Sequence, residues 1–129
     1  MTYKISIAIA LLTGLGMIFI GTRFLLAPET ATAGYGIHFA ANGDYSFDYI
    51  KGIRDIFSGL LIGIFALTKQ TKALGTTLTV GTIIPTVDML IVLSKEYNGI
   101  AQAIPHISAI IVCATVGTIL LKNTSNKAI

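Results

Sequence analysis

The sequence predicts an all-α integral membrane protein, built as an antiparallel up-down bundle of four transmembrane helices in a single domain, residues 1–129. Of its 129 residues, 53% are hydrophobic and only 12% are charged, whereas soluble domains carry about 25% charged residues. The mean hydropathy is +0.79. Four stretches also reach the roughly 20 apolar residues that a bilayer core requires. This composition excludes soluble, coiled-coil, disordered and disulfide-stapled classes of protein.

The predicted spans are joined by connections of very different length. The second and third connections are a few residues long, so neighbouring helices should form antiparallel hairpins. The first connection, residues 28–46, is long and rich in glycine and aromatic residues, which is typical of a functional loop. We expect it to form a lid or a plug. The first span is too long for a signal peptide, so we expect a retained helix. The spans are expected at about residues 5–27, 47–68, 73–94 and 99–121.

The distribution of lysine predicts the orientation. One side of the predicted bundle, with both termini and the second connection, has five lysines and no acid: Lys4, Lys69, Lys72, Lys122 and Lys127. The other side has one lysine and four acids: Lys95, Glu29, Asp44, Asp48 and Glu96. Because positive residues stay in the cytoplasm, both termini should be cytoplasmic in a multi-pass protein of the cell membrane.

Ionisable residues of the spans fall at one depth, in the outer half of the predicted bundle. Charges inside a membrane are costly unless paired or hydrated, so they are functional hypotheses. Asp88 and His106 follow Pro85 and Pro105, and proline kinks are tolerated where a wet cavity satisfies the freed backbone. An imidazole beside a carboxylate is a plausible acid–base pair. The candidate catalytic residues are therefore Asp55, Asp88 and His106.

Neighbouring polar residues predict the binding part of the site. Cationic and hydrogen-bonding groups at the same depth could hold an anionic or carbonyl group of a small lipophilic substrate. The candidates are Arg23, Tyr45, Lys51, Arg54 and Gln102.

A structural alternative stays open for the same charges. Arg54 could pair with Asp88, and Arg23 with Asp55, in a network that only fixes packing. A metal site is not expected, because no tight ligand motif is present and cations flank the carboxylates. No cofactor is expected either. Nucleic acid is excluded as a partner, because the basic residues lie at the ends of spans.

Glycines form a stripe on the second predicted helix. At 100° per residue, one arc of this helix is polar and contains Asp48, Lys51, Arg54, Asp55 and Ser58. Gly52, Gly59 and Gly63 lie beside this polar arc, and Gly59 and Gly63 have the GxxxG spacing of close helix contacts. The stripe predicts close contact with another helix, either within the chain or between the copies of a homo-oligomer. The opposite face is apolar and is expected to contact membrane lipid.

The chain resembles an uncharacterised family of small four-helix membrane proteins of bacteria and fungi, classed as a domain of unknown function. The resemblance covers nearly the whole chain. It implies a four-helix membrane fold and no established activity. It rests on KGIRDIFSGLLIG (Lys51 to Gly63), PTVD (Pro85 to Asp88), His106, GTRFLLAP (Gly21 to Pro28) and the pair Tyr35-Gly36.

Three functions remain in view. The first is binding or acid–base conversion of a small lipophilic substrate in an outward-facing polar cavity. The second is a transporter or channel component acting as an oligomer, although the inner half of the spans offers no polar route. The third is a structural or accessory membrane subunit.

Overall fold

The computed structural model describes residues 2–38 and 42–125, and every regular element within them is an α-helix. The all-α prediction is confirmed for this part of the chain. Lys127 and residues 39–41 of the expected loop lie outside it. The helices are α1 (Tyr3–Leu26), α2 (Pro28–Tyr35), α3 (Ser46–Leu67), α4 (Thr71–Gly81), α5 (Ile83–Leu93) and α6 (Ile100–Ser125).

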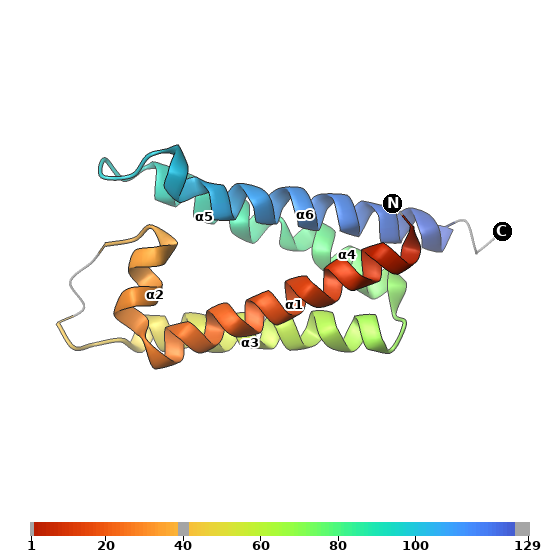
Figure 1. Cartoon of the computed structure of the whole chain (residues 1–129), viewed down its shortest axis with the longest axis horizontal. Helices are drawn as coiled ribbons and strands as arrows, with labels where there is room; N and C mark the ends of the chain where they lie inside the picture. Colours follow the sequence, from red (N-terminus) through yellow and green to blue (C-terminus); the bar gives the residue numbers. More distant parts are fainter. Residues whose placement is uncertain (1, 39–41, 126–129) are drawn as a thin grey trace.

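The long helices form two layers (Figure 1). Helix α1 packs along α3 in one layer, while α4 and α5 follow one another along α6 in the other. The start of α1 and the end of α6 lie at the same end of the molecule. The short helix α2 stands at the opposite end and contacts both α1 and α3.

Three helical segments of the described chain are long and apolar enough to cross a membrane: α1, α4 with α5 (Thr71–Leu93), and most of α6 (Ile100–Thr124). Their length and composition suit a membrane protein. Helix α3 has 22 residues, but it carries Asp48, Lys51, Arg54 and Asp55 and falls outside this set.

The predicted helix at residues 73–94 begins earlier, at Thr71, and is interrupted at Thr82. The break follows from Pro85, which has no N–H to donate to the carbonyl of Gly81 and whose ring crowds that carbonyl. Thr82 stabilises the turn, because its hydroxyl donates to the Thr79 carbonyl at 2.7 Å. The predicted kink therefore lies one turn before the proline.

The prediction of a loop over residues 28–46 is wrong for its first part, which forms α2. Pro28 occupies the start of the helix, where its fixed φ favours helix and its missing N–H costs nothing. Gly36 ends the helix with φ +91, a conformation that favours glycine. Eight residues are too few to produce a recognisable periodic pattern, so the sequence alone did not predict this helix.

Glycines bring α1 and α3 into backbone contact. A Cβ on Gly14 would lie 2.8 Å from the Gly59 carbonyl oxygen, and a Cβ on Gly52 would lie 2.8 Å from that of Gly21. The predicted close contact is confirmed for Gly52 and Gly59. A Cβ on Gly63 meets no atom within 4 Å, so this glycine does not make the predicted contact within the chain.

Candidate functional site

Tyr35, the last residue of α2, is the centre of a polar cluster between the two layers. Its hydroxyl donates a hydrogen bond to Oδ2 of Asp88 on α5. Its ring meets His106 of α6 edge-on, with 4.6 Å between the ring centroids. Burial and the hydrogen bond to Asp88 raise the pKa of Tyr35. The phenol therefore stays protonated at neutral pH and remains a donor.

The second member of the cluster is His106, whose residue surface is only 5% exposed. Its Nε2 lies 3.3 Å from the backbone carbonyl oxygen of Tyr35. A carbonyl can only accept, so Nε2 carries the hydrogen in this contact. In the neutral ring, Nδ1 is then the acceptor.

Lys51 and Asp55 form an ion pair one turn apart on α3, with 2.8 Å between Nζ and Oδ2. The ammonium group also lies 4.4 Å from the ring centroid of Tyr35 and 4.8 Å from that of Phe24. Aromatic faces attract cations at such distances. Lys51 is thus compensated by one carboxylate and two rings.

Helix α2 is held in place by contacts to both layers. Besides the bond from Tyr35 to Asp88, the hydroxyl of Thr32 donates to the buried Asp48 on α3. The side chain of Asn98 donates to the Gly36 carbonyl at 2.6 Å. These contacts fix the position of the Tyr35 ring above Lys51.

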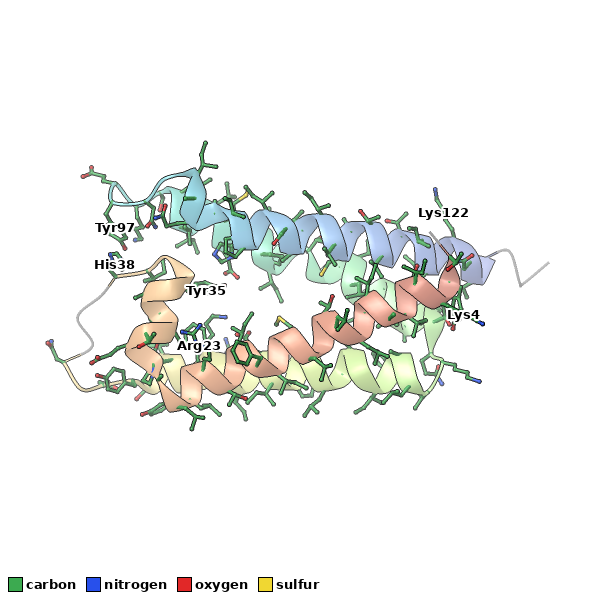
Figure 2. All side chains as sticks on the ribbon, in the orientation of Figure 1. Lys4, Arg23, Tyr35, His38, Tyr97 and Lys122 are labelled. Carbon is green, nitrogen blue, oxygen red and sulfur yellow. The ribbon has the colours of Figure 1, made fainter. Side chains whose placement is uncertain are left out.

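A cavity of about 140 Å³ lies beside the cluster, between α1, α2 and the start of α6. It has room for about five water molecules at liquid density or for the polar end of a larger molecule. Arg23 lines it and lies close to Tyr35 at the α2 end (Figure 2). Its walls are formed by Ile20, Arg23, Phe24, Ala31, Gly34, Tyr35, Pro105 and His106.

The structure brings four predicted site residues together around Tyr35: Lys51, Asp55, Asp88 and His106. Arg23 lines the adjoining cavity.

Three other predicted residues lie elsewhere. Arg54 is exposed on α3, because its position is rotated by 100° from the buried Asp55. The side chain of Gln102 accepts from the backbone N–H of Gly99 at 2.9 Å, as a cap of α6. The hydroxyl of Tyr45 donates to Glu29 at the surface.

The alternative ion pairs are wrong. Asp55 pairs with Lys51 of its own helix, and Asp88 accepts from Tyr35. Within the described ranges, neither Arg23 nor Arg54 makes an ion pair. For Asp88 the reason is α2, which places the Tyr35 phenol where an arginine was expected.

Sequence reasoning missed three members of the site: Tyr35, Phe24 and Thr32. Tyr35 lay in the expected loop, although the Tyr35-Gly36 pair was part of the family resemblance. A glycine directly after an aromatic residue is compatible with a helix end, and this was the one available signal. Nothing in the sequence pattern marked Thr32 or Phe24.

Replacement of Tyr35 by Phe should lower the free energy of unfolding by about 1–3 kcal/mol, because it leaves the Asp88 carboxylate without its donor. Thermal unfolding in neutral detergent, followed by circular dichroism, measures the loss of stability. Tyr97→Phe is the matched control. Its hydroxyl accepts from the exposed backbone N–H of His38 at 3.0 Å, so we expect a change below about 0.5 kcal/mol. Equal losses in both variants would contradict the central place of Tyr35.

The comparisons with known proteins add one finding. A family model described as "Domain of unknown function (DUF4267)" matches residues 14–120, a range that contains the whole cluster and its cavity. No curated protein and no solved structure matches the chain.

Proposed function

Because the chain belongs to the DUF4267 family, whose description names no activity, we propose a function from the geometry: an integral membrane protein that binds a small lipophilic molecule carrying a carboxylate or carbonyl group. The ligand's polar group would enter the cavity beside Tyr35. Its apolar part would extend into the surrounding lipid.

The proposal includes α3 as a fourth span. Its 22 residues extend over about 33 Å, and it packs along α1, one of the three apolar helices. Its charges occur only in its first half, and Lys51 and Asp55 neutralise one another. The residues on its outer face are apolar and exposed, as expected for contact with lipid: Ile53, Phe57, Leu60 and Ile64.

The proposed orientation places both termini in the cytoplasm and the polar cluster in the outer leaflet of the cell membrane. The lysine-rich ends support it, since Lys4 and Lys122 lie together at the end opposite α2 (Figure 2).

The observation that carries the binding proposal is the combination of Arg23 and His106 in a cavity with apolar walls. The Arg23 guanidinium has no carboxylate partner in the described chain, and guanidinium groups bind carboxylates in a two-point geometry. His106 lines the same cavity. A carboxylate or carbonyl oxygen of a ligand would supply the missing partner of Arg23, because such oxygens accept from a guanidinium.

Binding is better supported than acid–base conversion. Asp55 and Asp88 are engaged by Lys51 and Tyr35, and neither lines the cavity. Of the three candidate catalytic residues, only His106 faces a ligand there. A proton-transfer role would depend on this one side chain.

A structural role is the second candidate. Each carboxylate of the cluster has a partner in the described chain, namely Thr32 for Asp48, Lys51 for Asp55 and Tyr35 for Asp88. A network in which each of these carboxylates has a partner would also suit an accessory subunit, where the charges serve only to hold the helices together. An oligomer would have to use glycines with open space around them, such as Gly63.

Decanoate, a lipophilic carboxylate, tests the proposal on the protein in neutral detergent. We expect it to raise the melting temperature, whereas decanol should have little effect. Replacement of Arg23 by Gln should weaken decanoate binding at least tenfold, because a charge-assisted hydrogen bond contributes about 1.5–3 kcal/mol. Arg54→Gln is the matched control, since Arg54 is an exposed arginine at similar depth that does not line the cavity.

Equal weakening in both variants would show that decanoate binds through general charge attraction. Absence of any stabilisation by decanoate or by its methyl ketone analogue would leave the structural role as the better account of the cluster.

A further inference from the structure

A larger cavity of about 830 Å³ lies at the opposite end of the molecule, where α1 begins, α3 turns into α4 and α6 ends. Three lysines line it: Lys4, Lys69 and Lys72. Its lining includes no acidic residue, and Gln70 and Asn123 add amide groups. The hydroxyls of Tyr3 and Thr71, 3.0 Å apart, join α1 to the start of α4 at this site. The cavity is therefore suited to an anion that accepts several hydrogen bonds.

The backbone of Lys69 supports this interpretation. Its φ is +59, in the left-handed region that glycine and asparagine adopt at lower cost than other residues. Lysine is therefore poorly suited to the conformation of this turn. What Lys69 contributes there is a positive charge. Lys69 lines the cavity together with Lys4 and Lys72.

A second hollow of about 760 Å³ lies along α4. The two share Gln70 and Lys72 in their linings. Beyond these residues the second hollow is lined by four small or apolar residues and two threonines: Phe65, Ala73, Val80, Gly81, Thr76 and Thr77. A ligand held by the lysines could thus place an apolar chain along α4.

We propose that Lys4, Lys69 and Lys72 bind the phosphate of an anionic phospholipid of the cytoplasmic leaflet, with one acyl chain lying against Phe65 and Val80. Basic pockets between helices on the cytoplasmic side are suited to such head groups. The apolar hollow favours a lipid over a free phosphate. The inference rests on the orientation proposed above, and it does not depend on the cavity at Arg23.

Native mass spectrometry of the whole protein in neutral detergent tests the proposal with phosphatidylglycerol and phosphatidylcholine as probes. We expect preferential binding of phosphatidylglycerol. Lys72→Gln should weaken this binding about fivefold, the effect of one lysine near an anionic head group. Lys69→Asn should weaken it similarly while the turn stays folded, because asparagine tolerates the left-handed conformation.

Lys122→Gln is the matched control, since Lys122 lies at the same end of the molecule (Figure 2) but not in the cavity wall. Equal binding of the two lipids, or equal losses in Lys72→Gln and Lys122→Gln, would overturn the proposal. Displacement of the lipid by millimolar glycerol phosphate as effectively as by a short-chain phosphatidylglycerol would also overturn it, in favour of a soluble phosphate. Arg23→Gln should leave lipid binding unchanged, so this result is separable from the test of the outer cavity.

Discussion

Replacement of Lys51 by Met is expected to lower the free energy of unfolding by about 3 kcal/mol, because it leaves the Asp55 carboxylate without its counter-charge. The side chain of Asp55 is 12% exposed and that of Lys51 29% exposed, so solvent can replace little of the lost interaction. Methionine retains most of the apolar stem that packs near Phe24 and Tyr35. The loss therefore reports on the charge.

A double-mutant cycle separates the pair from its surroundings. Asp55→Asn in the Lys51→Met background should restore most of the stability, because a neutral pair needs no counter-charge. Unfolding in mixed micelles, monitored by circular dichroism, gives the four free energies. Lys95→Met is the control, since Lys95 makes no ion pair within the described residues. A cost below about 1 kcal/mol for Lys51→Met would show that Asp55 is hydrated in the membrane.

The sequence predicted α1 and α6 well because each of them is marked by a long apolar run. The first span, expected at about 5–27, is observed at Tyr3–Leu26. Prediction failed where the signal is short, since helix α2 has only eight residues. The kink expected from Pro85 is present, but it lies at Thr82, three positions before the proline.

The sequence predicted the level along the helices at which the site residues lie, but it did not predict which side chains contact one another. The common level of Asp55, Asp88 and His106 follows from their distance to the span ends, and the structure places all three around one side chain. Helical periodicity shows which residues share a face, but not which neighbour that face meets. Arg54 was assigned to the polar arc on this basis, and it lies at the surface. Tyr35 could not be placed without knowing that α2 is a helix.

Replacement of Gly59 by Ala is expected to lower the free energy of unfolding by about 2 kcal/mol, in the range of overpacked interiors. The new Cβ would overlap the Gly14 carbonyl oxygen and lie 2.8 Å from Cγ1 of Ile18. A carbonyl cannot rotate away as a side chain does. The second backbone contact, between Gly21 and Gly52, lies two turns along the same pair of helices, so α1 cannot tilt to relieve one clash without straining the other.

Gly63→Ala provides the control within the same stripe, because a Cβ at that position meets no atom within 4 Å. Alanine is favoured over glycine in a helix by up to about 1 kcal/mol, so Gly63→Ala should be neutral or slightly stabilising. Thermal unfolding of both variants in detergent measures the difference, with size-exclusion chromatography to determine the number of chains. If Gly59→Ala is as stable as Gly63→Ala, α1 and α3 cannot be in backbone contact. If Gly63→Ala instead dissociates an oligomer, the open part of the stripe forms an interface between copies, and the two glycines serve different contacts despite their GxxxG spacing.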